Sequence, residues 1–231
     1  MKIYCINNNQ NISREILAGL ESLTDEQKLV RIKKYRRQED YENALLADAL
    51  ARFAVLENTG ERYIRRPFLF NEYGKPGVPD DMTLQFNVSH SGQQVACAAG
   101  DKAIGIDVQL MEKMDLPDIA RRFFAPEEFR MLTEADDNEK KELFYDLWTL
   151  KESYIKALGK GLSIKLDAFC IIKTQTSIRY ETQLQHEPCY FKQYSVDDQY
   201  KLSVCSFSDD FPAEVTYITA AQLYQSLSGS I

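Results

Sequence analysis

The segment from Leu143 to Leu162 constrains the fold more than any other, because it predicts a helix with two different faces. Apolar side chains at three- and four-residue steps form one stripe: Leu143, Leu147, Leu150, Tyr154 and Leu158. On roughly the opposite side, Trp148, Glu152 and Lys156 form a second row at four-residue steps. A helix that packs one face on a core has no structural need for that second row. We therefore expect it to face a cleft or another domain.

An ordinary solvated helix offers a second explanation for the same charges. Glu152 and Lys156 are an i,i+4 pair in the favoured order, which stabilises any exposed helix slightly. Gly159 suits a helix C-terminus, where a residue comfortable at positive φ is preferred. If residues elsewhere in the chain could act together with the Glu152 carboxylate, the interpretation that the second row faces a cleft would be favoured over a solvated helix face.

The composition is that of a globular protein with an acidic balance. The 231 residues, 44% hydrophobic and 27% charged, suffice for one large domain or two of about 100 residues. The sequence shows no apolar run long enough to span a membrane, and polar residues after Ile6 argue against a signal peptide. Five scattered cysteines and two histidines argue against structural zinc and for a reducing cytoplasm. The net charge of −7 argues against a nucleic-acid binder.

Six cations nevertheless fall within ten residues of this acidic chain. They are Lys28, Arg31, Lys33, Lys34, Arg36 and Arg37. Thr24 and Gln27 form a capping-box pattern for a helix beginning near Asp25, which would place Lys28 and Arg31 on one side. The run is either a solvated helix face or a binding surface. A small phosphorylated ligand would suit such a surface better than a polymer, which would feel the overall repulsion.

Hydrophobic periodicity predicts a mixture of helices and strands. Helical periodicity covers residues 43–56 and 140–158. Strand-like alternation covers residues 84–88, 95–98, 104–108, 169–172 and 202–207. Residues 71–77 are turn material, and residues 89–92 are interpreted as a tight connection between two strands.

A weak internal repeat indicates two similar halves. The matched residues are Asp48 and Arg52 with Glu152 and Lys156, and Cys97 with Cys205. We expect an α+β fold of two similar α/β lobes, a pseudo-duplication, with small, mostly antiparallel sheets packed with helices and a cleft between the lobes. The expected domains are residues 1–102 and 103–231, with roughly the last 20 residues able to return to the N-terminal lobe.

The stretch from Ile104 to Gln109 offers candidate metal ligands. As a strand it would turn Gly105, Asp107 and Gln109 to one face, with Gly105 leaving room for a close approach. Mg²⁺ typically takes one or two protein carboxylates plus substrate phosphates, and Asp107 with Glu152 would supply that minimum. Taken alone, Asp107 is better explained as an ordinary aspartate at a strand end.

Three spaced motifs together resemble a known family. They are Phe-Asn-Val-Ser-His-Ser-Gly at 86–92, Gly-Ile-Asp-Val-Gln at 105–109 and Trp-x-x-Lys-Glu-Ser-x-x-Lys-x-x-Gly-x-Gly-Leu at 148–162. Their order and spacing resemble those of the 4′-phosphopantetheinyl transferases. The length and the Tyr-Gly-Lys-Pro turn at 73–76 are similar to the Sfp-type branch, whose chains contain two α/β halves in tandem. The resemblance is strongest from Lys28 to Leu166.

The resemblance implies an activity. Such enzymes move the phosphopantetheine arm of coenzyme A onto a serine of an apo carrier protein and release 3′,5′-ADP. It implies that Asp107, Gln109 and Glu152 hold Mg²⁺, that Glu152 or a water it orients takes the serine proton, and that Lys156 neutralises the pyrophosphate. Many Sfp-type chains carry Glu where this chain has Gln109, which implies weaker metal binding, a water in place of the side chain, or tolerance of Mn²⁺.

The resemblance also implies a coenzyme A site in the N-terminal lobe, with the metal and catalytic residues in the C-terminal lobe. The residues it assigns to the coenzyme are Lys28, Arg31, Gly74, Lys75, Pro76, Ser89, His90 and Lys156. Of these, Lys28 and Arg31 would contact the 3′-phosphate, and residues 74–76 would border the adenine. Glu127 or Glu128 would be an accessory acid near the metal.

The expected partners are apo carrier domains, peptidyl and also acyl, with no nucleic acid and no membrane, for a cytoplasmic monomer. Four apolar residues are candidates either for gripping a carrier helix or for core packing: Leu110, Met111, Met114 and Leu116. The alternative function is a non-catalytic module that binds coenzyme A or a carrier protein without transferring the arm.

Overall fold

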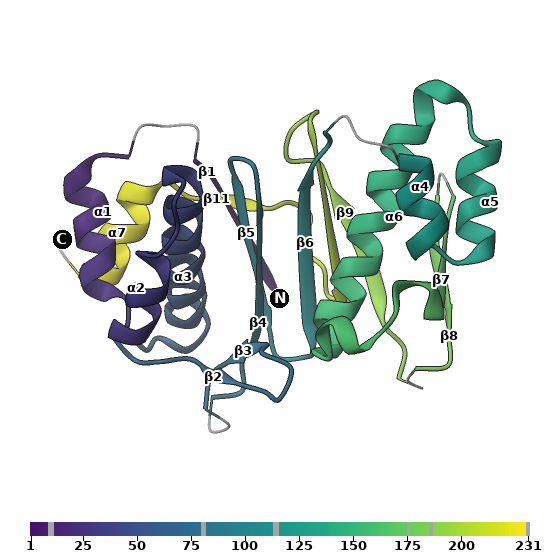
Figure 1. Ribbon diagram of the computed structural model, residues 1–231. Helices are drawn as coiled ribbons and strands as arrows, with labels where there is room; N and C mark the ends of the chain where they lie inside the picture. The colour runs from purple at the N-terminus through teal and green to yellow at the C-terminus, as the bar shows by residue number, and fades with distance from the viewer. Residues whose placement is uncertain (9–11, 80–81, 113–115, 175, 185–186, 230–231) are drawn as a thin grey trace.

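The computed structural model describes residues 1–8, 12–79, 82–112, 116–174, 176–184 and 187–229, with two β-sheets between layers of helices (Figure 1). The first sheet contains, in spatial order, β11 (Thr216–Tyr217), β1 (Lys2–Asn7), β5 (Gln94–Gly100) and β4 (Gln85–Ser91). The second contains β6 (Ile104–Leu110), β10 (Tyr200–Ser206) and β9 (Tyr190–Tyr194). Neighbouring strands are antiparallel, except for the parallel pair β1 and β11. The predicted fold class is confirmed.

Helices cover the outer side of each sheet. Beside the first sheet lie α1 (Arg14–Leu23), α2 (Glu26–Ile32), α3 (Gln38–Thr59) and α7 (Ala220–Ser228). Beside the second lie α4 (Leu116–Phe123), α5 (Pro126–Glu134) and α6 (Asp137–Leu158). We call these two assemblies the N-terminal and C-terminal lobes. Among the described residues, no helix is both long enough and apolar enough to cross a membrane.

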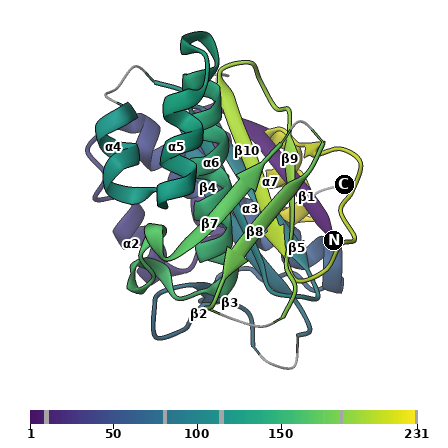
Figure 2. The same ribbon diagram turned by 90° about the vertical axis from the view of Figure 1, so that its right-hand side faces the viewer.

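Two small hairpins complete the lobes. The first consists of β2 (Leu69–Phe70) and β3 (Pro76–Gly77), and the second of β7 (Phe169–Lys173) and β8 (Ile178–Thr182). Short 3₁₀ helices at Gly161–Ser163 and Leu166–Ala168 connect α6 to β7. Figure 2 shows the β7–β8 hairpin on the outside of the C-terminal lobe.

An apolar layer between the two sheets holds the lobes together. It includes Ile3, Cys5, Ala96 and Ala98 of the first sheet and Ile104, Ile106, Val108, Leu202 and Val204 of the second. Because side chains alternate along a strand, this packing turns Gly105, Asp107 and Gln109 of β6 toward α6. All five cysteines are free thiols.

Gly105 sets the distance between α6 and β6. A Cβ atom at this position would lie 2.0 Å from the Ser153 carbonyl oxygen and 2.4 Å from the Ala157 nitrogen. The room that the sequence indicated at Gly105 is therefore taken by the backbone of α6. The apolar stripe of α6 is confirmed, with Leu147, Leu150 and Tyr154 fully buried and Leu143 and Leu158 partly buried against the same core.

The lobes repeat one plan. The strand order β1-β5-β4 corresponds to β6-β10-β9, and α3 and α6 each span 22 residues before a left-handed glycine, Gly60 or Gly159. Cys97 and Cys205 occupy equivalent positions, opposite Tyr4 and Gly105 respectively. The predicted match of Arg52 with Lys156 is wrong, because Arg52 and Lys151 each stand eight residues before the capping glycine.

Polar side chains join β4 to β6 at the seam between the lobes. Asn87 Oδ1, Ser89 Oγ and Ser91 Oγ accept hydrogen bonds from the Ile106, Val108 and Leu110 amides at 2.9, 3.3 and 3.0 Å. Residues 89–91 are therefore part of a strand, and the expected tight connection is confined to the residues after Ser91.

The helix α2 carries only Lys28 and Arg31 of the six clustered cations, and it begins one residue later than the capping-box pattern indicated. Asp25 is its N-cap and accepts a hydrogen bond from the Lys28 amide at 3.0 Å. Thr24 cannot act as the N-cap of α2, because it ends α1 and its hydroxyl donates to the Leu20 carbonyl at 3.1 Å.

Candidate active site

Asp107 is the centre of a polar cluster built from both lobes. Its side chain is almost fully buried, and Oδ1 accepts hydrogen bonds from Lys156 Nζ at 2.7 Å and Ser89 Oγ at 2.9 Å. Gln109 Nε2 donates to the other oxygen, Oδ2, at 3.2 Å. Residues from β4, β6 and α6 thus meet at one carboxylate.

Lys156 spans the seam between the lobes. Besides Asp107, its ammonium contacts Ser89 Oγ at 3.0 Å and the Ile106 carbonyl at 3.2 Å. Its side chain is 27% exposed, so the ammonium is held in place yet still borders solvent. Lys156 therefore pairs with Asp107 within its own lobe and reaches Ser89 of the N-terminal lobe, and the explanation of the second row as a plain solvated helix face is wrong.

Glu152 lies one helical turn before Lys156. Partial burial is the main cause that raises the pKa of the Glu152 carboxyl, and the negative charge of Asp107 raises it further. The positive charge of Lys156 opposes this shift. In the described part of the chain, the Glu152 carboxylate accepts no hydrogen bond. Two neighbouring carboxylates that repel each other in a half-buried site favour a cation between them.

A divalent cation fits this set of donors. Among the described residues, no group of three or more His, Cys, Asp or Glu side chains is placed to hold a metal ion. The third expected ligand is instead the amide of Gln109. Its Oε1 accepts a hydrogen bond from Ser91 Oγ at 3.4 Å. Mg²⁺ needs only one or two protein carboxylates when substrate phosphates and water complete its octahedron. Asp107, Glu152 and Gln109 would hold the ion.

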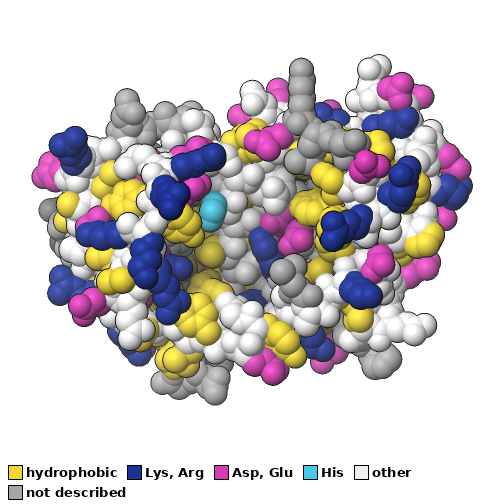
Figure 3. Space-filling model, viewed as in Figure 1, with side chains coloured by type: hydrophobic (Ala, Val, Ile, Leu, Met, Phe, Trp, Pro, Cys, Tyr) yellow, Lys and Arg dark blue, Asp and Glu magenta, His cyan; other side chains and the backbone are white. Residues whose placement is uncertain are grey.

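A cavity of about 340 Å³ beside α2, called the α2 cavity here, brings together several predicted coenzyme-binding residues. Lys28 and Arg31 line it on one side, and Gly74 and Pro76 on the other. Its apolar lining includes Phe68, Phe70, Phe86, Ala47, Ala51 and Val88. Figure 3 shows Lys and Arg side chains gathered on the N-terminal lobe beside the hollow between the lobes. A flat aromatic ring carrying phosphates matches this combination of apolar walls and cations.

His90 connects the α2 cavity to Asp107 electrostatically. Partial desolvation by the surrounding protein lowers the pKa of the His90 imidazole, as do the charges of Lys156 and Lys28, whereas Asp40 opposes them. His90 therefore senses both the cation of the α2 cavity and the cation at Asp107.

Lys75 has a different environment from its neighbours Gly74 and Pro76. Its ammonium donates to the Lys156, Ile104 and Ala157 carbonyls, at 2.7, 2.9 and 3.3 Å. Burial lowers the pKa of Lys75 to about 8. The predicted contact of residue 75 with a coenzyme would therefore fall to its backbone.

A second cavity, of about 280 Å³, lies beside Gln109 and is called the Trp148 cavity. Its lining comprises Ser91, Gln109, Leu110, Glu112, Ile119, Phe144, Tyr145 and Trp148. Of the second helix row, Trp148 lines this cavity while packing partly on the C-terminal core, and Lys156 reaches Ser89 of the N-terminal lobe. Of the apolar candidates for carrier contact, Leu110 lines this cavity and Met111 and Leu116 pack on the C-terminal core. Met114 lies outside the described residues.

Two buried ionic networks were not found from the sequence. Lys151 is fully buried and contacts both oxygens of Glu128 at 2.6 and 2.7 Å and the Phe169 carbonyl at 2.7 Å. In the N-terminal lobe, fully buried Arg52 contacts Asp48 at 2.7 Å and Asp25 at 3.5 Å. The available signal was Lys151 itself, which follows Leu147 by one helical turn and so lies within the apolar stripe.

The expectation of an accessory acid near the metal is wrong. Glu128 also accepts hydrogen bonds from the Ala125 and Ile171 amides, so its carboxylate is fully used inside the C-terminal core. Glu127 is exposed and pairs with Arg130 at 2.5 Å. Neither residue forms an acidic cluster with Asp107 and Glu152.

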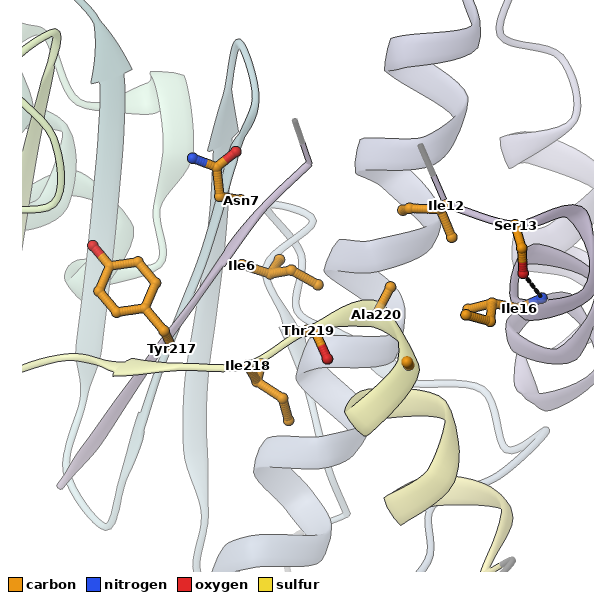
Figure 4. A pocket seen from close by; sticks show the side chains of 10 residues that line it. Ile6, Asn7, Ile12, Ser13, Ile16, Tyr217, Ile218, Thr219 and Ala220 are labelled. Atoms are coloured by element: carbon orange, nitrogen blue, oxygen red, sulfur yellow. Dashed lines mark hydrogen bonds between the residues drawn. The ribbon is translucent and has the colours of Figure 1, made fainter. Parts of the chain in front are cut away.

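A further cavity, of about 420 Å³, lies in the N-terminal lobe between the end of β1, the start of α1 and the β11–α7 segment (Figure 4). Ile6, Ile12, Ile16 and Ile218 dominate its lining, and its described lining residues include no charged side chain. It therefore lacks the cations that phosphates require.

Comparisons with known proteins agree with these observations. The family model described as "4'-phosphopantetheinyl transferase superfamily" matches residues 103–205, and that described as "4'-phosphopantetheinyl transferase, N-terminal" matches residues 10–102. The 4'-phosphopantetheinyl transferase Sfp of Bacillus subtilis is 37% identical over 96% of this chain and 100% of its own length. The transferase ffp of Bacillus subtilis is 37% identical over 95% of this chain and 98% of its own. The transferase gsp of Aneurinibacillus migulanus is 34% identical over 92% and 89%.

Proposed function

This chain belongs to the Sfp-type 4′-phosphopantetheinyl transferases, and we propose that it moves the phosphopantetheine arm of coenzyme A to a serine of an apo carrier domain. One observation carries the assignment of the site: Asp107, Glu152 and Lys156 lie together at the seam between the lobes, next to a cation-lined cavity. The N-terminal lobe, formed by residues 1–102 together with the returning β11 and α7, would bind the nucleotide of coenzyme A. The C-terminal lobe, formed by the chain from residue 103 up to β11, would supply the metal ligands and the catalytic groups.

The α2 cavity would take the 3′-phosphoadenosine part of coenzyme A. Its apolar walls suit the purine ring, and the Gly74 and Pro76 backbone leaves space for it. Lys28 and Arg31 would neutralise the 3′-phosphate. Ser89, His90 and Lys156 would then contact the pyrophosphate, because Ser89 and Lys156 contact Asp107 and the charges of Lys28 and Lys156 both act on His90.

In the reaction, the serine oxygen attacks the pyrophosphate phosphorus that bears the pantetheine arm. The bond from that phosphorus to the bridging oxygen breaks, and 3′,5′-ADP leaves. Bound Mg²⁺, or Mn²⁺, would supply charge neutralisation for the pyrophosphate. Glu152 takes the serine proton as the general base. Lys156 stabilises charge that grows as the bond breaks.

The proposed clients are carrier domains of peptide or polyketide synthases, with acyl carriers as further clients. The Trp148 cavity is open beside Gln109 and supports this proposal, because an arm or carrier segment that reaches the metal needs an apolar approach. One chain provides both halves of the site, which supports a monomer. Free thiols at all five cysteines support a reducing cytoplasm.

The test mixes the protein with coenzyme A, Mg²⁺ and an apo peptidyl carrier domain and follows the intact mass of the carrier. We expect a gain of one phosphopantetheine group, which requires metal and disappears with a carrier whose acceptor serine is Ala. An apo acyl carrier and Mn²⁺ form parallel arms. Binding of coenzyme A without any mass gain on several carriers, with either metal, would instead indicate the non-catalytic module.

A further inference from the structure

The loop between β2 and β3 contacts both the nucleotide site and the catalytic helix. Gly74 and Pro76 line the α2 cavity. Between them, Lys75 sends its side chain to the other lobe, where the ammonium bonds the Lys156, Ala157 and Ile104 carbonyls. Nearby, Asn71 Nδ2 donates to the Gly159 carbonyl at 2.7 Å. One short loop thus forms a wall of the cavity and a cap on α6.

These carbonyl groups need a partner from outside their helix. The last carbonyls of an α-helix lack intrahelical donors, and the negative end of the helix dipole favours a cation. Lys156 and Ala157 lie in the last turn of α6, before Gly159. The cation that satisfies them comes from 81 residues away in the N-terminal lobe. The carbonyl of Ile104, at the start of β6, brings the strand of Asp107 into the same cluster.

The loop does not need the Lys75 ammonium for its own shape. Asn71 Oδ1 accepts hydrogen bonds from the Tyr73 and Lys75 amides at 3.0 and 2.9 Å. The Asn71 amide donates to the Lys75 carbonyl at 3.1 Å, and the Gly74 amide to the Asn71 carbonyl at 3.0 Å. The wall of the cavity is therefore built locally, and the ammonium acts only between lobes.

We propose that Lys75 is a positioning residue, which fixes the cavity wall at Gly74 and Pro76 relative to the Lys156 end of α6. The proposal rests on the proposed function, because the α2 cavity matters to α6 only if one coenzyme A molecule extends from the cavity to Lys156. The Lys75 side chain then keeps the pyrophosphate in line with Lys156 and Glu152 without touching the substrate itself.

Lys75→Met tests the proposal, because it keeps the length of the side chain and removes its three donors. The matched control is Lys160→Met, which removes an exposed lysine just after Gly159. For both variants and the wild type, we would measure kcat, the KM for coenzyme A, coenzyme A binding by calorimetry, and circular dichroism. We expect Lys75→Met to lower kcat by about 10-fold to 100-fold, as small misplacements of reacting groups do. Coenzyme A affinity should change less than about threefold, because the cavity wall persists.

The outcomes separate the two proposals. A wild type that modifies no carrier contradicts the proposed function, whatever the variants do. An active wild type with a folded Lys75→Met variant whose kcat is within twofold of it overturns the positioning role. Equal losses in affinity and kcat also overturn it, since they indicate a contact with the coenzyme itself or a general loosening of the fold. If Lys75→Met does not fold, Lys75→Gln, which keeps part of the donor set, decides by the same comparison of kcat with affinity.

Discussion

The two lobes fill the same strand–helix interface in different ways. In the N-terminal lobe, Tyr4 of β1 and Phe53 of α3 form an edge-to-face pair with ring centroids 5.2 Å apart. At the equivalent positions the C-terminal lobe has Gly105 and Glu152, since Phe53 and Glu152 each stand seven residues before the capping glycine. The aromatic pair holds α3 away from β1, whereas Gly105 brings α6 against β6 and places Glu152 near Asp107.

Both lobes retain a fully buried cation at one equivalent position. Arg52 joins Asp48 and Asp25 to the Arg66 carbonyl, and Lys151 joins Glu128 to the Phe169 carbonyl. Each cation links its helix to a preceding helical segment and to a backbone carbonyl that follows the helix, Arg66 in a loop and Phe169 at the start of β7. The lobes therefore share the buried cation and differ at the position of Glu152, where chemistry is proposed. This comparison identifies Arg52 and Lys151 as structural charges and Glu152 as a functional one.

Removing Lys151 should have the largest effect on stability. Lys151→Met leaves the Glu128 carboxylate buried without a cation, and such losses cost about 3–5 kcal/mol of unfolding free energy. Denaturant unfolding measures this, with Lys140→Met as control, because it removes an exposed pair from the same helix. If both variants unfold at the same denaturant concentration, the buried pair contributes nothing.

Arg52→Met sharpens the comparison of the buried cations. It should also destabilise the protein by about 3–5 kcal/mol, and by the same mechanism. Arg52 additionally holds Asp25, the N-cap of the helix that carries Lys28. The KM for coenzyme A should therefore rise in Arg52→Met and stay unchanged in Lys151→Met. A similar KM in both variants would show that the two cations have the same role.

Glu152→Gln should separate activity from stability. Loss of the base and of a metal ligand should lower kcat by about 10³-fold, equivalent to about 4 kcal/mol. Because burial and Asp107 raise the pKa of Glu152, the folded state holds this proton more tightly than the unfolded chain. Stability is thus lost as pH rises through the raised pKa. At neutral pH without metal, the variant should melt at a higher temperature than the wild type.

The pH dependence provides the control for Glu152→Gln. The melting difference should vanish as the pH falls below the ordinary carboxyl range, because Glu152 is then protonated in both the folded and unfolded states. A variant that melts below the wild type at neutral pH would contradict the raised pKa. Near-normal kcat would contradict the proposed role of Glu152 as base and ligand.

Gly105→Ala tests whether the close approach of α6 defines the catalytic lobe. The new Cβ would meet backbone atoms at 2.0 and 2.4 Å, which cannot rotate away as side chains do. We expect a loss of about 3 kcal/mol, at the upper end for overpacking, with little transfer activity in the folded fraction. Gly77→Ala, where a Cβ would meet nothing within 4 Å, is the matched control. Equal stability of the two variants would mean that α6 moves freely.

The sequence predicted much of the site because the signals were local. Periodicity placed Leu150 in the core and Glu152 in the cleft, and alternation along β6 separated Asp107 from Ile106. Local patterns say which face a side chain takes, but not which distant group it meets. The pairing of Lys75 with carbonyls of the other lobe, and of Lys151 with Glu128, depends on three-dimensional packing that no spacing encodes. Thr24 and Asp25 are both residue types that suit an N-cap. Only Asp25 caps α2, because the Thr24 hydroxyl donates to the Leu20 carbonyl.

Gln109→Glu is expected to have the smallest effect, and it reports on the metal. The substitution adds a carboxylate beside Asp107 and should tighten Mg²⁺ about tenfold, or about 1.4 kcal/mol. The half-saturating Mg²⁺ concentration for transfer measures this, and Gln199→Glu, on an exposed turn, controls for the added charge. In the N-terminal lobe the equivalent residue, Asn8, donates its amide to Asn43 at 3.1 Å and serves only structure. An unchanged metal dependence in Gln109→Glu would give Gln109 that same structural role, leaving Asp107 and Glu152 as the protein ligands.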